Sequence, residues 1–217
     1  MSTFIEPLIL YAVLFFRISS GTVLSEEVVH FSVTAEIARI FMYNIPSIAL
    51  VWYLMLKVKS LKEWGISFPW KKDIKPAVLA LPALILIGMT VSLVSQHFQD
   101  MPSGIRFLSP QTTFEWIILV FSCFTTAYLE ESFFRFYLLS KQEEMGIGPH
   151  RAILISSLLF SSCHIYEGPW GFLNAALSGI VLAVIFLKFH SLHGISVAHA
   201  LYNIVVYMLG SIGGHAA

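Results

Sequence analysis

Charged side chains are scarce in this chain of 217 residues. Asp, Glu, Lys and Arg make up 12% of it, about half the share that is usual for a soluble domain, whereas 57% of the residues are hydrophobic. A soluble fold of this size could not cover so much apolar surface with a wettable exterior, and the same composition excludes intrinsic disorder. The 13 basic and 13 acidic residues cancel, so no excess of charge favours nucleic acid as a partner.

Cysteine is nearly absent as well. The two cysteines, Cys123 and Cys163, both lie inside apolar runs, so a disulfide framework is excluded and we interpret them as small packing residues. The sequence has no low-complexity segment and no convincing internal repeat. We therefore expect residues 1–217 to form a single transmembrane domain with no soluble domain appended.

The sequence contains several long apolar stretches with few charged residues. A membrane-spanning helix needs about 20 mostly apolar residues, and seven stretches approach this length, the fifth and seventh being short. They cover about residues 4–24, 37–56, 77–95, 114–139, 152–163, 170–189 and 195–209. The sequence therefore predicts an all-α fold, a polytopic transmembrane helical bundle of about seven spans.

The basic residues predict an orientation for these spans. Six lysines lie between residues 57 and 75, in the loop that follows the second stretch. Cytoplasmic loops carry an excess of Lys and Arg, so we expect this loop to be cytoplasmic. Lys141 and Lys188, near the ends of the fourth and sixth stretches, then lie on the same side, and the N-terminus is also cytoplasmic.

Ionisable residues inside apolar stretches are costly in lipid, so they face the bundle interior and mark a functional site by default. The fourth stretch holds two adjacent carboxylates, Glu130 and Glu131, followed by Arg135. Glu131 and Arg135 are four residues apart and can pair, whereas Glu130 is rotated by about 100° and should point at a different neighbour. Glu130 is thereby left available as a general base. The alternative is a buried ion-pair network that fixes the helix register.

Two further stretches carry polar residues. His164 ends the fifth stretch, and His199 and Asn203 lie four apart on one face of the seventh. Taken singly, His164 is explained as an interfacial residue and the other two as an interhelical hydrogen-bonding pair. Together with Glu130 they are typical of a hydrolytic site. Glu130 and His164 would position and deprotonate a water, and His199 and Asn203 would donate hydrogen bonds to the oxyanion of a tetrahedral intermediate.

These residues, in this order, resemble the motif set of the CPBP intramembrane metalloprotease family. The motifs are Glu130-Glu131-x-x-x-Arg135, Phe160-x-x-x-His164 and His199-x-x-x-Asn203, on successive apolar stretches. The family comprises the CAAX prenyl protease type 2 enzymes and bacteriocin-processing or immunity proteins, also called the Abi family. The motif-bearing protease core covers about residues 113–209. No single motif is specific, but the order of all three is.

The resemblance implies an intramembrane endopeptidase, a hydrolase of the CAAX prenyl protease type 2 kind. It implies that Glu130, assisted by His164, activates the water, and that His199 and Asn203 form the oxyanion site. It implies a supporting role for Glu131 and Arg135. The implied partners are membrane lipid and a membrane-bound or lipidated peptide or protein, a prenylated CAAX-type substrate among them. The implied location is a bacterial plasma membrane, in which the chain is integral.

A metal ion is the main alternative to this mechanism. Glu130, His164 and His199 form a ligand set that is common in catalytic zinc sites. The sequence lacks His-Glu-x-x-His, the usual helical zinc-protease motif, and the resemblance favours a metal-independent glutamate mechanism. We therefore expect no cofactor, with a divalent metal such as zinc on these three residues as the alternative.

Two other functions compete with a protease. A non-catalytic membrane protein, such as an immunity factor or scaffold, would keep the same polar cluster for packing. A small transporter or proton relay also uses intramembrane Glu and His, but it predicts pseudo-symmetric halves, which the sequence does not show.

Overall fold

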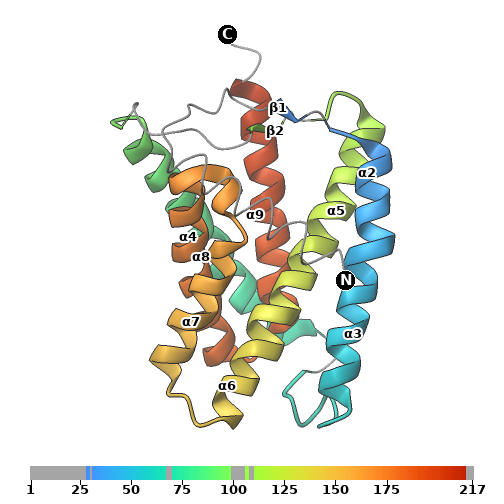
Figure 1. Ribbon diagram of the computed structural model, residues 1–217, viewed down its shortest axis with the longest axis vertical. Helices are drawn as coiled ribbons and strands as arrows, with labels where there is room; N and C mark the ends of the chain where they lie inside the picture. The colour runs from blue at the N-terminus through green and yellow to red at the C-terminus, as the bar shows by residue number, and fades with distance from the viewer. Residues whose placement is uncertain (1–27, 30, 67–69, 99–105, 108–109, 214–217) are drawn as a thin grey trace, which may run out of the picture.

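The computed structural model of the protein describes residues 28–29, 31–66, 70–98, 106–107 and 110–213. Almost all of this part of the chain is helical (Figure 1), so the predicted all-α class is confirmed. The exception is a parallel pair of two-residue strands, β1 (Val28–Val29) and β2 (Arg106–Phe107). The helices are α2 (Val33–Ala38), η1 (Arg39–Asn44), α3 (Ile45–Leu56), η2 (Trp70–Asp73), α4 (Ile74–Ser95), α5 (Thr113–Glu131), η3 (Ser132–Leu139), α6 (Ser140–Glu144), α7 (Pro149–Ser162), η4 (Ile165–Glu167), α8 (Gly168–Phe189) and α9 (Leu192–Gly213).

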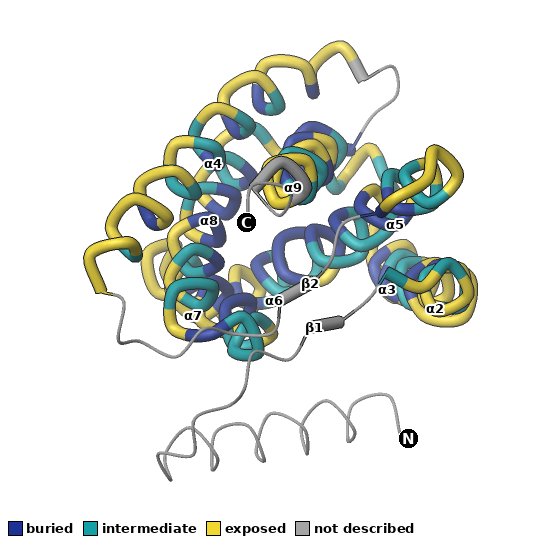
Figure 2. The backbone as a smooth tube through the Cα atoms, turned by 90° about the horizontal axis from the view of Figure 1, so that it is seen from above, coloured by how far each residue is buried: buried dark blue, intermediate teal, exposed yellow. Residues whose placement is uncertain are grey.

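The helices form one bundle in which α9 has a central place. Figure 2 shows α9 between α4 and α8 on one side and α5 on the other, with α2 and α3 outside α5. Helix α7 packs on α8. The residues buried by this arrangement lie on the faces that the helices turn toward α5, α8 and α9 (Figure 2). The three helical regions that carry the predicted motifs therefore meet in the interior.

Five helical segments of the described chain are long and apolar enough to cross a membrane. They are residues 33–56, 71–95, 113–144, 165–189 and 192–210. The predicted count of about seven spans is not confirmed. The span predicted at residues 4–24 lies outside the described residues. The span predicted at residues 152–163 forms α7, whose 14 residues are too few to cross a membrane. After α7 the chain turns at Gly168, which has a φ of 79°, and α8 begins.

The distribution of polarity is the reverse of that in a soluble protein. Large apolar side chains are exposed along the outside of the helices, among them Phe41, Met42, Leu86 and Phe121. Polar side chains are buried inside instead, including Glu131, Ser132, Arg135, Ser156 and Ser161. Such an exterior suits a lipid environment, in which interior polar groups supply much of the specific helix contact.

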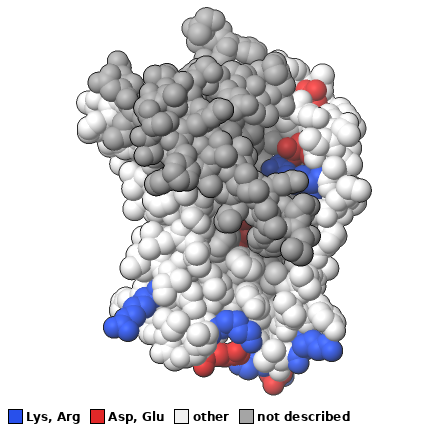
Figure 3. Space-filling model, viewed as in Figure 1, with Lys and Arg blue, Asp and Glu red and all other residues white. Residues whose placement is uncertain are grey.

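The lysines gather at one end of the bundle. Figure 3 shows basic and acidic side chains together at its lower end, whereas the described surface visible above them is mostly uncharged apart from a small patch of basic and acidic side chains higher up. Lys59 forms an ion pair with Glu144 at 3.6 Å, which joins the end of α3 to α6. Lys75 lies 5.7 Å from the ring centre of Phe189, which joins the start of α4 to the end of α8. One lysine-rich end agrees with the pattern from which a cytoplasmic side was predicted.

Helix α5 begins with a capping box and ends in a π-helix. The Thr112 hydroxyl accepts a hydrogen bond from the backbone N–H of Glu115, and the Glu115 carboxylate accepts one from that of Thr112. After Glu131 the helix widens into the π-helix η3, where the sequence predicted a regular helix. The Ser156 hydroxyl of α7 donates to the Phe134 carbonyl oxygen within η3 at 2.9 Å. A π-helical turn inside an α-helix often accompanies a functional site.

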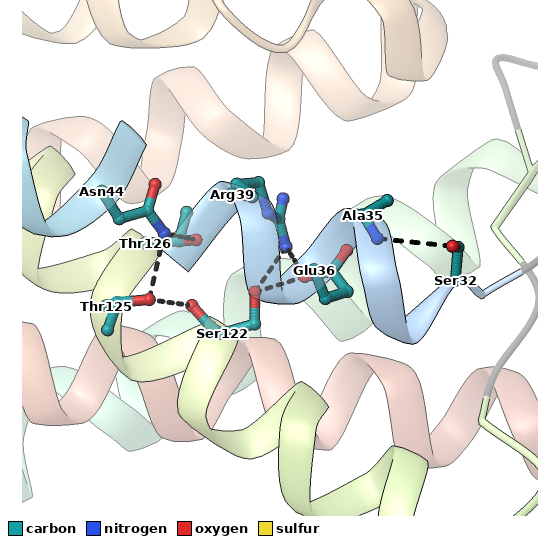
Figure 4. A network of polar contacts seen from close by, with 8 residues as sticks. All are labelled: Ser32, Ala35, Glu36, Arg39, Asn44, Ser122, Thr125 and Thr126. Carbon is teal, nitrogen blue, oxygen red and sulfur yellow. Dashed lines mark hydrogen bonds and ion pairs between the residues drawn. The ribbon is translucent and has the colours of Figure 1, made fainter. Parts of the chain in front are cut away.

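A polar network attaches the N-terminal helices to α5 (Figure 4). Arg39 forms an ion pair with Glu36 at 2.5 Å and donates to the Ser122 hydroxyl at 2.7 Å. Asn44, one turn further along, donates to the Thr125 and Thr126 hydroxyls at 3.0 Å each. Hydrogen bonds of this kind hold helices together in lipid, where no hydrophobic force does so. Helix α5 is thus anchored on its outer side as well as by the core.

Candidate active site

The centre of the site is a fully buried ion pair within one helix. Arg135 Nη1 donates to Glu131 Oε1 at 3.0 Å, and neither side chain is exposed. This confirms the pairing predicted from the spacing of four residues. Arg135 Nη2 also donates to the carbonyl oxygen of Gly179 on α8 at 3.3 Å. A buried ion pair is stable only where such additional hydrogen bonds offset the cost of removing both charges from water.

His199 of α9 is held between the two adjacent carboxylates. Its Nδ1 lies 2.8 Å from Glu131 Oε1, and its Nε2 lies 3.6 Å from Glu130 Oε2. Glu130 therefore faces a different neighbour from Arg135, as predicted, but both carboxylates also face the His199 ring, which was not predicted. The reason is that the two nitrogens of an imidazole lie on different edges, so one ring can face two side chains that leave their helix in different directions.

Glu130 and Glu131 nevertheless differ in their surroundings. Glu131 is completely buried and its Oε1 is shared between Arg135 and His199. The Glu130 side chain is 21% exposed, and its distance of 3.6 Å to His199 Nε2 is too long for a hydrogen bond. Glu131 is therefore committed to a structural ion pair, whereas Glu130 lies beside it with a free edge.

Phe160 connects the second motif to the other two. Its ring lies 4.4 Å from the guanidinium carbon of Arg135 and 5.8 Å, centre to centre, from the His199 ring. His164 packs on the same ring at 4.7 Å, and its Nδ1 lies 3.0 Å from the Phe160 carbonyl oxygen. If Nδ1 donates in that bond, Nε2 of His164 is left as an acceptor. Phe160 belongs to the quoted motif, but its role as the shared contact was not predicted.

Asn203 lies one turn beyond His199 on α9 and is half-buried. The neighbouring Tyr202 ties this part of α9 to α8, because its hydroxyl accepts a hydrogen bond from Asn174 Nδ2 at 3.0 Å. A Cβ on Gly88 of α4 would lie 2.5 Å from the Tyr202 hydroxyl oxygen, so the tyrosine can pack here only because residue 88 has no side chain. The register of α9 around His199 and Asn203 is thus set from two neighbouring helices.

Glu167 is a carboxylate near the site that the sequence reasoning missed. It lies at the end of η4, close enough to His164 and Glu130 to interact with both electrostatically. A Cβ on Gly171 would lie 2.2 Å from the Glu167 Cβ, so the glutamate packs directly on the glycine backbone. The signal available in the sequence was an ionisable residue three positions after His164, at the start of an apolar stretch.

The predicted ligand set for a metal is not assembled. Among the residues that the structure describes, no three His, Cys, Asp or Glu side chains are grouped so that they could hold a metal ion. No chemical step is therefore derived through a zinc ion on Glu130, His164 and His199.

One comparison with known proteins finds a relative of this site. Residues 112–205 match a family described as type II CAAX prenyl endopeptidase Rce1-like. The match runs from the N-cap of α5 into α9, so it includes all six predicted site residues. No curated protein and no solved structure matches the chain. The resemblance read from the three motifs is confirmed: residues 112–205 of this integral membrane chain are similar to the Rce1-like family of CAAX prenyl endopeptidases.

Proposed function

We propose that this protein is an intramembrane endopeptidase in which Glu130 activates the water that attacks the peptide bond. The observation that carries the proposal is that the two adjacent glutamates differ in burial and in hydrogen bonding. Glu131 is bonded to both Arg135 and His199. Glu130 is partly exposed, and its Oε2 lies 3.6 Å from Nε2 of His199. A carboxylate beside a histidine, in a dry bundle, is suited to general-base catalysis.

The proposed reaction is a hydrolysis in two stages. Glu130 takes a proton from a water whose oxygen attacks the carbonyl carbon, with His164 Nε2 helping to hold that water. The resulting oxyanion receives hydrogen bonds from His199 and Asn203. The proton on Glu130 then passes to the leaving nitrogen, the C–N bond breaks, and a carboxylic acid and an amine are released. All atoms are balanced without a further reactant.

The partner of His199 sets a condition on this mechanism. When Nδ1 donates to Glu131, Nε2 can act as a donor to the oxyanion only if the ring carries both protons. Nδ1 faces Glu131, which is also paired with Arg135, and Nε2 faces Glu130. Glu131 is thus proposed to orient the His199 ring so that Nε2 points toward Glu130 and the reacting atoms.

The proposed substrate is a lipidated peptide that reaches the site from the membrane. The family match supports a CAAX-type substrate, and the apolar exterior of the bundle supports delivery through lipid. The proposed step uses no metal or other cofactor, and the described residues include no group of three His, Cys, Asp or Glu side chains that could hold a metal ion.

The test is cleavage of quenched fluorescent peptides by the full chain in detergent. A farnesylated CAAX peptide is compared with the same peptide without the lipid. We expect Glu130→Gln to lower kcat by about 100-fold or more. The matched control is Glu143→Gln, which removes an exposed carboxylate at the lysine-rich end, and both variants are first shown to be folded.

Three results would contradict parts of the proposal. Full activity in Glu130→Gln would exclude Glu130 as the base. Equal cleavage of both peptides would exclude a need for the lipid. No cleavage of either peptide by the wild type, with Glu130→Gln less stable than the control, would favour the non-catalytic immunity or scaffold protein.

A further inference from the structure

A second polar contact joins α5 to α9 outside the three motifs. The hydroxyl oxygen of Tyr128 lies 2.5 Å from Nδ1 of His193, and the two rings stack with their centres 5.8 Å apart. Tyr128 is three residues before Glu131, on the same side of α5, and His193 is six residues before His199 on α9. The same two helices (Figure 1) are therefore bonded twice, once here and once through His199.

Trp52 of α3 holds this contact from the outside. Its ring stacks on Tyr128 and on His193, with centres 6.3 Å apart in both cases and the planes within 18° and 22° of parallel. Its Nε1 donates to the Ser132 hydroxyl at 3.2 Å, at the point where the π-helix η3 begins. Stacked aromatic rings limit the rotation of one another, so three helices are fixed at one place.

The start of α9 is anchored to the start of α4 next to this cluster. The Ser191 hydroxyl donates to the buried carboxylate of Asp73, which lies within electrostatic reach of His193. A Cβ on Gly194 would lie 2.4 Å from the Asp73 carbonyl oxygen and 2.5 Å from the Ser191 hydroxyl. This close approach needs a glycine, so α9 can slide or turn here only if the contact with α4 is broken.

These anchors matter because His199 has to meet two glutamates at once. The distances of 2.8 Å and 3.6 Å to Glu131 and Glu130 depend on the rotation and height of α9 relative to α5. A displacement of about 1 Å at a catalytic group can cost 100-fold in rate. The Tyr128–His193 contact is a second bond between α5 and α9, six residues along α9 from His199, so it opposes rotation of α9 about the first bond.

We propose that Tyr128 and His193, clamped by Trp52, are positioning residues that fix α9 so that His199 bonds Glu131 and faces Glu130. They act through His199 and do not touch the substrate. This inference rests on the proposed function for its effect on catalysis, but its structural part, the placement of the His199 ring, is measurable without any activity.

The experiment compares the full chain with variants of the pair in detergent. Tyr128→Phe removes only the hydroxyl and keeps the stacked ring, and His193→Leu removes both nitrogens. His193→Asn keeps a polar atom near the place of Nδ1. Tyr137→Phe is the matched control, since it removes a hydroxyl from η3, which continues α5, at a ring that stacks on Phe133. The readouts are the ¹⁵N signals of the His199 ring, assigned with His199→Gln, and the separate values of kcat and KM.

We expect Tyr128→Phe and His193→Leu to shift the His199 signals and to lower kcat about tenfold with KM changed less than about twofold. His193→Asn should restore the wild-type signals in part, and Tyr137→Phe should change nothing. Unchanged His199 signals in both Tyr128→Phe and His193→Leu would overturn the inference. If the wild type cleaves no peptide, the proposed function fails, and the ¹⁵N signals alone still decide whether the pair positions His199.

Discussion

One carboxylate oxygen, Oε1 of Glu131, is shared by Nδ1 of His199 at 2.8 Å and by Nη1 of Arg135 at 3.0 Å. The motif on α5 and the motif on α9 are therefore joined by a single atom in the interior of the bundle. A change to any of the three side chains alters the hydrogen bonding of the other two, so their effects on stability should not be additive.

Loss of the Glu131 charge should destabilise the protein strongly. Glu131→Gln leaves the Arg135 guanidinium buried without its counter-charge, and removal of one partner of a buried pair costs about 3–5 kcal/mol. The free energy of unfolding in mixed detergent micelles measures this. Glu144→Gln is the control, because its ion pairs with Lys141 and Lys59 are partly exposed and should each contribute at most about 1 kcal/mol. If both substitutions lower the free energy of unfolding equally, the buried pair contributes no more to stability than the partly exposed ones.

Phe160 should be needed for both stability and activity. Phe160→Ala removes the ring on which Arg135, His164 and His199 pack, and truncation of a buried phenylalanine costs about 3–5 kcal/mol. Phe160→Leu, which keeps more of the volume, tests the ring itself and should still reduce kcat. Phe121→Leu serves for comparison, since Phe121 is exposed on the outside of α5 and its replacement should change stability by less than about 0.5 kcal/mol. Wild-type kcat in Phe160→Leu would contradict the role of the ring.

Gly171 should tolerate no side chain while Glu167 is present. A Cβ at this position would lie 2.2 Å from the Glu167 Cβ, so Gly171→Ala must displace the glutamate or the helix, at about 1–3 kcal/mol. Thermal unfolding should show the loss, and it should be smaller in Glu167→Gly, where the clashing Cβ is gone. Gly148→Ala meets open space and is the control. The same loss with and without the Glu167 side chain would locate the strain elsewhere.

A strong chelator should leave peptide cleavage unchanged. In the described part of the chain, Glu130, His164 and His199 are not grouped as metal ligands. The assay is kcat after dialysis against the chelator, with and without added Zn²⁺. Inactivation that Zn²⁺ reverses would overturn the metal-independent mechanism and favour the zinc alternative.

Local spacing was a good guide within single helices. The separation of four residues correctly paired Glu131 with Arg135, because side chains that far apart in a helix are neighbours whatever surrounds them. The run of apolar residues correctly indicated a helical membrane protein, and the order of the three motifs indicated the family that the comparison finds. The roles of Glu130, His164, His199 and Asn203 in the reaction stay predictions.

Spacing failed where the geometry depends on contacts between helices. It correctly separated Glu130 from Arg135, but it did not predict that both carboxylates face His199. It predicted a regular helix through Arg135, whereas the structure has a π-helix there, with Ser156 of α7 bonded to a carbonyl oxygen of that segment. It also did not find Tyr128 and His193, because a tyrosine and a histidine 65 positions apart carry no common signal.

The sequence alone determined that this chain is an apolar helical bundle with a carboxylate pair, an arginine and two histidines inside it, because composition and helical period follow from neighbouring residues. Only the tertiary structure decided that His199 lies between the two carboxylates, bonded to Glu131 and facing the exposed edge of Glu130. That placement depends on how α9 lies against α5, and the packing of α3, α4 and α8 around them sets it.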